Sequence, residues 1–438
     1  MKLLYAIIDE NRYVVESKGH NVCLLTSETE VSTGYGFESP EADNQWIFKH
    51  CGIRVYRKYL YLVGNDCTAV FEPVGSTALK DGYTWASEDQ ISGSEPDMIS
   101  ALRLAQNGER SKTAPWMGQH GILRYLDWAK TKLTGLGYTI QGTIQQVKNA
   151  YVSSIFRIPT NAGTMYLKIT ASVYVNTAAV EQQIANSVGS LPVFIALSPD
   201  GYAVITKEMP GHDCQSGNAS SYKTWLENWG EQQVRTAEKN IFNLADRSPQ
   251  KLISGISAFE HQINRIFEAA SHPLSVSKWE LLHRRLAEIK IILEKLCQYP
   301  IPNAVCHGDI RPGNVRITDD AEILYDWGMA FYGHPFYDAL HFLHVVRRQL
   351  SDQQKAEIIC SYLSKWEHFC DKQMLLDAYA LAEQCKEYFM LAADFQWVAD
   401  ILKVCSGIPP LGTIDNWLLS KRFDYLHGTL HKFLSETV

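Results

Sequence analysis

The sequence lacks the surplus of basic residues that a general nucleic-acid-binding protein shows. It has 41 Lys and Arg against 48 Asp and Glu, a net charge of −7. It also lacks an apolar run of about 18 residues, so we expect no membrane-spanning helix. The apolar part of the first ten residues, MKLLYAIIDE, is too short for a signal peptide. We therefore expect a cytoplasmic protein with neither nucleic acid nor membrane as its partner.

No two of the ten cysteines form a C-x-x-C pair, which argues against a zinc site and a thioredoxin-like motif. Scattered cysteines in a chain of 438 residues are typical of buried thiols in a reducing compartment. There is no internal repeat and no low-complexity tract. The hydrophobic fraction of 46% and the charged fraction of 20% fit a globular protein, and the length predicts two or three domains.

The residue pattern changes along the chain and predicts an α+β protein with three parts. Residues 1–110 form a β-rich N-terminal domain that ends in a polar junction. Residues 117–210 form a small β-rich lobe, and residues 211–438 form a large, mostly helical lobe. We expect a single β interruption in the helical lobe, a hairpin over residues 315–326.

One loop in the helical lobe, CHGDIRPGNVRI at residues 306–317, combines turn residues with polar side chains. Asn314 precedes the first strand of the predicted hairpin and Asp326 ends the second, so antiparallel pairing brings the two side by side. Amide and carboxylate oxygens suit Mg²⁺ bound to phosphate. Asp309 then remains free to accept a proton from an attacking hydroxyl. These are the parts that phosphoryl transfer requires.

The stretches VCHGDIRPGNV and ILYDW resemble the H-G-D-x-x-x-x-N and D-W patterns of the aminoglycoside phosphotransferase and choline kinase family. The resemblance covers about residues 117–438. It implies a bilobal protein-kinase-like fold with ATP and Mg as cofactors. By resemblance, Asp309 is the catalytic base, Asn314 and Asp326 are magnesium ligands, and His307 braces the loop. Arg311 either binds phosphate or substrate or braces the loop from outside.

The small lobe offers matching parts. In GTMYLKITA, alternation points Lys168 away from the face shared by Met165, Leu167 and Ile169. Glu181 is the only acid in a helix predicted over residues 178–189. Lys168 and Glu181 resemble the ion pair with which the family holds the α- and β-phosphates.

Two further segments resemble nucleotide-binding parts of the family. TKEMPG resembles the segment that links the lobes, so backbone groups of Lys207, Glu208 and Met209 are expected to meet the adenine. In KNAYVSS, Ser153 and Ser154 are expected to donate hydrogen bonds to phosphate. This loop lacks the G-x-G-x-x-G of protein kinases, which favours a small-molecule kinase.

The stretch GMAFYGHPFYDALHFL resembles the family's G-x-P-x-x-D-L-A segment, with Asp338 in the Asp position. We expect Asp338 to be structural and to cap the helix that begins near Ala339. The histidines of this region are predicted to be packing and capping residues rather than a metal set: His334, His341 and His344.

Glu383 and Glu387 lie one turn apart on a predicted helix. In the family, carboxylates from the C-terminal helices often hold a cationic substrate. The alternative is a solvated acidic face, which we favour.

The N-terminal domain has weaker signals. Its β-rich start and the segment YTWASEDQI resemble Nudix hydrolases, but no R-E-x-x-E-E cluster supplies ligands for their magnesium chemistry. We expect a non-catalytic domain that caps the kinase, mediates a homodimer or shapes the substrate site. Bacterial maltose kinases also carry a β-rich cap, but their loop commonly has Gln where this chain has Asn314.

These observations predict an ATP- and Mg-dependent phosphotransferase that acts on a hydroxyl of a small molecule, such as an antibiotic, an amino alcohol or a sugar. Two alternatives stay open. One is a nucleotide-binding pseudokinase or regulatory module. The other is a nucleotidyl transferase on a kinase scaffold.

Overall fold

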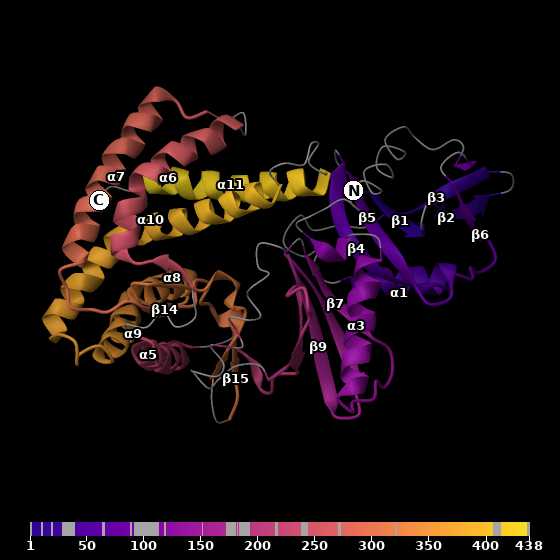
Figure 1. Ribbon diagram of the computed structural model, residues 1–438, viewed down its shortest axis with the longest axis horizontal. Coiled ribbons are helices and arrows are strands. Elements are labelled where there is room, and N and C mark those ends of the chain that lie inside the picture. The colour runs from indigo at the N-terminus through magenta and orange to yellow at the C-terminus, as the bar shows by residue number, and fades with distance from the viewer. Residues whose placement is uncertain are drawn as a thin grey trace. The chain divides into compact units, whose positions relative to one another are not determined.

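The chain forms two compact units in a computed structural model (Figure 1). The first unit comprises Met1–Ala178, Val193–Glu208 and Asp400–Leu419, and the second comprises Ala179–Pro192, Met209–Ala399 and Ser420–Val438. The structure describes residues 2–9, 12–18, 21–28, 40–63, 66–87, 90–91, 114–117, 120–150, 152–171, 181, 183, 193–214, 218–237, 244–269, 273–319, 322–405 and 413–435. Within these residues, no helix has both the length and the apolar character needed to cross a bilayer.

The first unit begins with a six-stranded sheet in the order β4-β5-β1-β3-β2-β6. Its strands are β1 (Lys2–Asp9), β2 (Arg12–Lys18), β3 (Asn21–Glu28), β4 (Arg54–Val63), β5 (Asp66–Val74) and β6 (Tyr83–Ala86). β1 pairs with β5 in parallel, and the other pairings are antiparallel. Helix α1 (Glu41–Cys51) contributes Ile47 to a core on one face of this sheet, beside Tyr5 and Ile7 of β1.

A second sheet in this unit has five strands in the order β10-β11-β9-β8-β7. Its strands are β7 (Gln145–Ala150), β8 (Ser153–Thr160), β9 (Gly163–Thr170), β10 (Phe194–Leu197) and β11 (Ala203–Lys207). Helix α3 (Gly121–Gly135) precedes it, after the short helix η4 (Pro115–Met117). The predicted alternation in β9 is confirmed, because its three apolar residues are fully buried: Met165, Leu167 and Ile169.

The two sheets share one hydrophobic core. Ala6 and Tyr13 of the six-stranded sheet belong to the same cluster of buried side chains as Leu126 of α3 and Phe156 of β8. Strand β1 is therefore buried on both faces, with Tyr5 and Ile7 toward α1 and Ala6 toward the shared core. The first unit therefore contains both the predicted N-terminal domain and the small lobe, joined by this shared core, while the N-terminal sheet has a second core of its own with α1.

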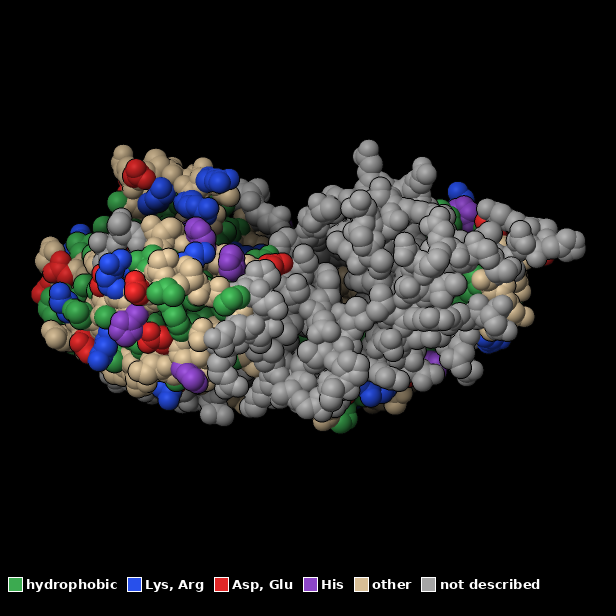
Figure 2. All heavy atoms as spheres, turned by 90° about the horizontal axis from the view of Figure 1, so that it is seen from above, with side chains coloured by type: hydrophobic (Ala, Val, Ile, Leu, Met, Phe, Trp, Pro, Cys, Tyr) green, Lys and Arg blue, Asp and Glu red, His purple; other side chains and the backbone are tan. Residues whose placement is uncertain are grey.

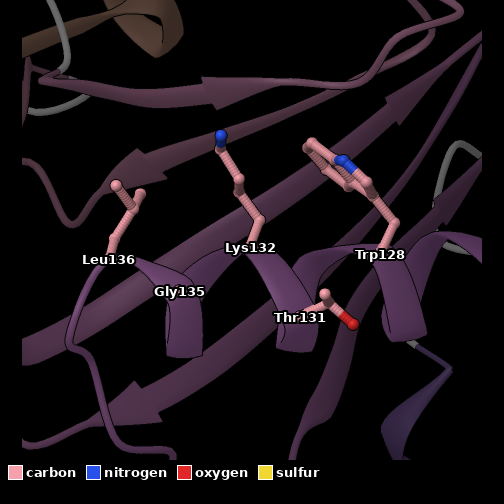
Figure 3. A pocket seen from close by; sticks show the side chains of 5 residues that line it. All are labelled: Trp128, Thr131, Lys132, Gly135 and Leu136. Carbon is pink, nitrogen blue, oxygen red and sulfur yellow. The ribbon is translucent and has the colours of Figure 1, made fainter.

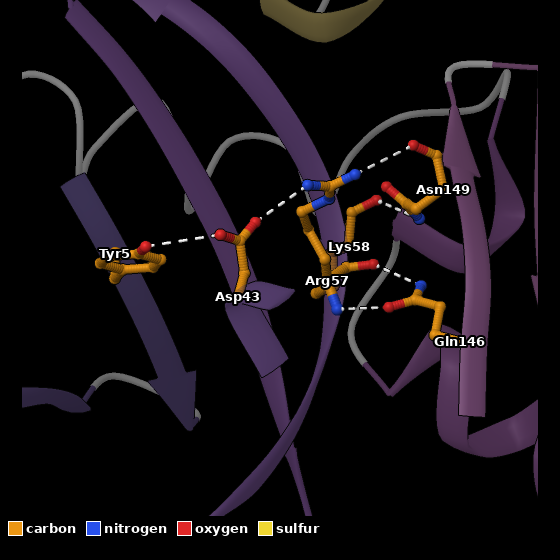
Figure 4. A network of polar contacts seen from close by, with 6 residues as sticks. All are labelled: Tyr5, Asp43, Arg57, Lys58, Gln146 and Asn149. Atoms are coloured by element: carbon orange, nitrogen blue, oxygen red, sulfur yellow. Dashed lines mark hydrogen bonds and ion pairs between the residues drawn. The ribbon is translucent and has the colours of Figure 1, made fainter. Parts of the chain in front are cut away.

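Two facing irregularities connect the edges of the sheets (Figure 4). The β4–β5 pairing shifts register between Arg57 and Tyr59, and the β7–β8 pairing shifts between Gln146 and Lys148. The Gln146 amide accepts from Arg57 N–H at 2.7 Å and donates to Arg57 C=O at 2.8 Å. The Gln146 side chain thus makes the pair of hydrogen bonds that a neighbouring strand would make with Arg57, and so joins the two sheets.

Further contacts extend this connection. Asn149 Nδ2 donates to Lys58 C=O at 3.3 Å. The buried Arg57 guanidinium pairs with Asp43 Oδ2 at 3.0 Å and reaches Asn149 C=O at 3.5 Å. Burial raises the pKa of the Asp43 carboxyl despite this guanidinium. Figure 4 shows that the network begins at Tyr5 of β1, so it passes from the centre of one sheet to the edge of the other.

The second unit is mostly helical. Its helices are α5 (Ala219–Arg235), α6 (Pro249–Ala269), α7 (Val276–Leu296), α8 (Phe336–Val346), α9 (Asp352–Ser364), most of α10 (Lys372–Cys405) and most of α11 (Thr413–Ser435). On the described surface in Figure 2, acidic, basic and histidine side chains lie interspersed. This mixture agrees with the absence of a basic surplus in the sequence.

The prediction of a single β interruption was wrong, because the second unit contains two three-stranded sheets. The predicted hairpin is present as β15 (Val315–Ile317) and β16 (Glu322–Leu324), with β12 (His212–Asp213) beside it. The other sheet combines β13 (Ala245–Arg247), β17 (Phe331–Gly333) and β14 (Ala304–Cys306). Strands of three residues are too short to show a period of two.

Candidate active site

The loop His307–Arg311 connects β14 to the short helix η7 (Pro312–Asn314) and so to the hairpin. β14 is entirely buried, which anchors the start of the loop. Tyr325 N–H donates to Asn314 C=O at 3.0 Å, beyond the last strand pair. The hairpin therefore places Asn314 opposite Tyr325, one residue before Asp326.

His307 is fully buried and holds the loop from inside. Its Nδ1 accepts from Asp309 N–H at 3.2 Å, which assigns the ring proton to Nε2, and Nε2 lies 3.0 Å from Tyr325 C=O. Burial lowers the pKa of this imidazole, although the nearby Asp338 opposes the shift. A neutral His307 can therefore connect the loop to the far strand of the hairpin.

The backbone conformation and the close surroundings of residue 308 require glycine. Its φ of 83° lies in the left-handed region. A Cβ at this position would stand 2.2 Å from Met329 C=O, inside any normal contact. The chain can thus pass this close to Met329 only with glycine.

The expected capping role of Asp338 was wrong, because α8 begins at Phe336 and has no side-chain cap. The fully buried Asp338 carboxylate instead accepts from the N–H groups of His307 at 2.8 Å and Gly308 at 3.0 Å. Trp229 Nε1–H donates to it at 3.0 Å. Burial raises the pKa of this carboxyl, while His307 and the backbone donors oppose that shift. Asp338 thus fixes the loop backbone.

Asp309 projects from the loop with about a third of its side chain exposed. Its Oδ2 accepts from Asn314 Nδ2 at 3.1 Å and lies 3.3 Å from Arg311 Nε. Its Oδ1 lies 3.5 Å from His341 Nε2. Burial acts to raise the pKa of this carboxyl, but His341 and Arg311 hold the pKa below its usual value. The geometry provides an accessible, ionised carboxylate, as a general base requires.

Asn314 and Asp326 end the two sides of the hairpin. Both hydrogen bonds of the buried Asn314 side chain to the loop use Nδ2, to Asp309 C=O at 2.8 Å and to Asp309 Oδ2. Its Oδ1 thus points to a different side from Asp309. Asp326 has a φ of 67°, a left-handed conformation that is uncommon outside glycine and is often found at functional sites. An amide oxygen and a carboxylate at one hairpin end fit a magnesium site.

Glu181 is described although most of its predicted helix lies outside the described residues. It is buried, and its Oε1 accepts from Trp327 N–H at 3.0 Å, next to Asp326. Lys168 lies half-buried on β9, between Ile155 of β8 and Val204 of β11. Lys168 belongs to the first unit and Glu181 to the second, so their ion pair stays a prediction.

The two predicted phosphate-binding serines lie at the start of β8, and both are buried. Ser154 Oγ accepts from Gln146 Nε2 at 3.0 Å and from Asn149 Nδ2 at 3.3 Å. This hydroxyl orients the two amides that contact β4. Since a buried hydroxyl has no access to a phosphate, we leave Ser154 out of the proposed site. Ser153 is 4% exposed, and we leave its side chain out for the same reason.

The predicted adenine-binding segment follows β11. Glu208 N–H donates to Thr164 C=O at 2.9 Å, and the exposed Glu208 carboxylate accepts from Tyr166 Oη–H at 3.2 Å. Both bonds fix the end of β11 against the start of β9. Met209 is half-buried and opens the next segment of the second unit.

The remaining candidate polar residues lie in different surroundings and make different contacts. Glu383 is exposed, whereas Glu387 is buried and pairs with Lys432 Nζ at 2.7 Å, so the expectation that both belong to a solvated acidic face was wrong for Glu387. His334 Nδ1 accepts from Phe336 N–H at 3.3 Å, near the start of α8, in line with a packing and capping role. His341, in contrast, faces Asp309.

A hollow of about 210 Å³ lies on α3 in the first unit (Figure 3). Trp128, Lys132 and Leu136 line it. No carboxylate is among the residues that line it, so it offers no carboxylate base, and the candidate catalytic groups remain those of the loop and hairpin.

Residues 155–369 match the Phosphotransferase enzyme family. The chain contains a domain of this family. The matched residues run from β8 to just beyond α9 and include the loop, the hairpin and α8. The protein-kinase-like α+β fold expected from the motif is thereby confirmed.

The chain is similar to several solved structures at low identity. A choline/ethanolamine kinase family protein from Mesorhizobium loti has 17% identity and a TM-score of 0.43, with 71% of this chain and 98% of that chain covered. Macrolide 2'-phosphotransferase type I has 13% identity and a TM-score of 0.46, with 71% and 97% covered. ADP-bound aminoglycoside phosphotransferase APH(2'')-Ib has 12% identity and a TM-score of 0.44, with 71% and 96% covered. No curated protein matches the chain.

Proposed function

We propose that the protein is an ATP- and Mg-dependent phosphotransferase that transfers the γ-phosphoryl group of ATP to a hydroxyl of a small molecule. The single observation that carries the proposal is the Asp309 carboxylate, ionised and partly exposed, beside a hairpin end that bears Asn314 and Asp326. The family match supports the same chemistry. When bound, Mg·ATP would supply the phosphoryl group and neutralise the charge on it.

Five polar residues of the loop and the hairpin have a role in this proposal. Asp309 orients the acceptor hydroxyl and takes its proton as the hydroxyl oxygen attacks. Asn314 and Asp326 hold the metal. Arg311, half exposed beside Asp309, faces the transferred phosphate or the acceptor. His307 holds the loop in place without touching the substrate.

Lys168 is further proposed to bind the α- and β-phosphates and to form an ion pair with Glu181. Backbone groups of Lys207, Glu208 and Met209 are proposed to meet the adenine. The acceptor belongs to the class of antibiotics, amino alcohols and sugars. We also propose that the protein works in the cytoplasm, since seven of its ten cysteines are free thiols in the structure, as in reducing compartments.

The N-terminal sheet is proposed to have no catalytic role of its own and to resemble Nudix domains in fold only. The proposed homodimer would form through this sheet. Light scattering of the purified chain tests the dimer, and a monomeric mass at micromolar concentration contradicts it.

The test of the main proposal is Asp309→Asn, measured by ADP release over a panel of hydroxylated metabolites and antibiotics. Turnover should fall by about 10²–10⁴-fold, the contribution of a general base. Binding of ATP, followed by its thermal shift, should survive. Near-full turnover in this variant would show that Asp309 is not the base. If the wild-type chain shows no nucleotide-dependent thermal shift, the kinase assignment fails, and release of pyrophosphate instead of ADP would indicate nucleotidyl transfer.

A further inference from the structure

The two oxygens of the Asp309 carboxylate have different surroundings. Oδ2 has two neighbours, Asn314 Nδ2 at 3.1 Å and Arg311 Nε at 3.3 Å. Among the described residues, Oδ1 has only His341 Nε2 at 3.5 Å. A carboxylate oxygen offers about two lone-pair sites. Oδ2 therefore has two donor groups beside it and Oδ1 has one at a longer distance, so Oδ1 is the oxygen more open to an incoming hydroxyl.

Within the part of the chain that the structure describes, the contact with Asp309 is the one ion pair that His341 makes. Its ring is 15% exposed, and neither ring nitrogen has a hydrogen-bond partner among the described residues. Buried polar groups without partners are rare and call for an explanation. The ring lies parallel to that of Tyr337, with centroids 6.0 Å apart, so its plane is fixed by packing. The distance to Oδ1 is longer than a normal hydrogen bond, which makes the contact an electrostatic one.

Helix α8 connects this contact to the loop. Asp338 and His341 are three residues apart and therefore lie on the same face of the helix. Asp338 binds the backbone of His307 and Gly308, and His341 meets the side chain of Asp309. One rigid element thus fixes both the path of the loop and the orientation of its carboxylate.

We propose that His341 is a positioning residue of this enzyme, which holds Oδ1 of Asp309 toward the acceptor hydroxyl while Asn314 and Arg311 hold Oδ2. With a group on each oxygen, rotation of the carboxylate about its Cβ–Cγ bond is restrained. The hydroxyl then meets Oδ1 along its remaining lone pair. The inference rests on the proposed phosphotransferase function.

Three variants test the role of His341. His341→Phe keeps a ring beside Tyr337 and removes both nitrogens. His341→Gln keeps an amide donor at about the same distance from the backbone as Nε2, so that it can still approach Asp309. The control is His344→Gln, one turn further along α8, which has no contact with Asp309 in the structure. The probe is Mg·ATP with water as the acceptor, followed by ADP release.

We expect kcat of His341→Phe to fall by about 10- to 100-fold, as for a misplaced reacting group. KM for ATP should stay unchanged, and His341→Gln should recover most of the loss. A purely structural role would not separate kcat from KM or permit this rescue. Equal kcat in His341→Phe and wild type, or an equal loss in His341→Phe and His341→Gln, would overturn the proposal.

A second measurement does not need turnover. Thermal unfolding of Asp309→Asn, His341→Phe and the double variant forms a double-mutant cycle. Paired side chains give Tm shifts that do not add, and additive shifts would overturn the inference even if the enzyme is active. Non-additive shifts in a chain without ATP turnover would instead keep the contact and reject the phosphotransferase function.

Discussion

The Gln146 side chain allows a quantitative test of how the two sheets of the first unit are joined. Gln146→Ala removes the acceptor for Arg57 N–H and the donor to Arg57 C=O, the bonds of 2.7 and 2.8 Å. A buried polar group that loses its partner costs about 1–3 kcal/mol, so the two bonds together give roughly 2–6 kcal/mol. For a unit of this size that corresponds to a fall in Tm of roughly 5–20 °C.

A nearly isosteric change separates the hydrogen bonds from packing. Gln146→Glu keeps an acceptor for Arg57 N–H, but an ionised carboxylate cannot donate to Arg57 C=O. Burial raises the pKa of the introduced carboxyl above its value in the unfolded chain. Its protonated form can donate, so the variant is closest to wild type at low pH and loses stability as pH rises through the folded-state pKa.

The matched control is Gln145→Glu, since Gln145 is half-buried and its Oε1 lies 3.4 Å from Arg157 Nη1. Thermal unfolding by circular dichroism between pH 5 and 8 would compare the three variants with wild type. The reasoning is refuted if Gln146→Ala unfolds at the wild-type Tm. It is also refuted if the Tm deficits of Gln146→Glu and Gln145→Glu follow the same course with pH.

Other predictions concern the loop. Gly308→Ala places a Cβ against Met329 C=O, so we expect loss of ADP release and a destabilisation of more than about 2 kcal/mol in denaturant unfolding, and a fully active variant would contradict the tight approach. Asp338→Asn puts an amide donor against the N–H of His307 or Gly308, which should cost about 2–4 kcal/mol of stability. We expect a lower Tm together with a lower kcat. An unchanged kcat would show that the loop keeps its conformation without the Asp338 carboxylate. Asp326→Asn and Asp326→Ala should both lose Mg-dependent turnover. Only the alanine variant should also lose about 1–2 kcal/mol of stability, because Asn tolerates the left-handed backbone at this position and Ala does not. Equal Tm values for the two variants would contradict the role of the left-handed backbone.

The local parts of the site could be predicted from the sequence. The stretches NVRIT and EILYDW, on either side of the turn residues Asp319 and Asp320, were enough to place the hairpin. Alternation in β9 was enough to turn Lys168 away from the core. These inferences use neighbours within about twenty positions of the chain.

Contacts between distant residues could not be predicted in this way. Asp338 was expected to cap its own helix, but it binds the backbone of the loop thirty residues earlier. His341 was grouped with packing residues, since nothing in the sequence brings α8 beside Asp309. Ser154 lies at a position that resembles a phosphate-binding loop, and only the fold shows that its hydroxyl serves the β4–β7 connection. The spacing of His341 three positions after Asp338, on the same face of a helix, is a signal that could be sought in a sequence.

The connection made by Gln146 also bears on how such a chain can change in evolution. The family match begins at residue 155, one strand after β7, so the matched segment alone would leave β8 without its edge partner and the shared core open. To keep this junction, a replacement for the N-terminal sheet would need a strand with an irregularity opposite Gln146 and apolar side chains that complete the core. Loss of either sheet would expose the side chains that the other contributes to this core.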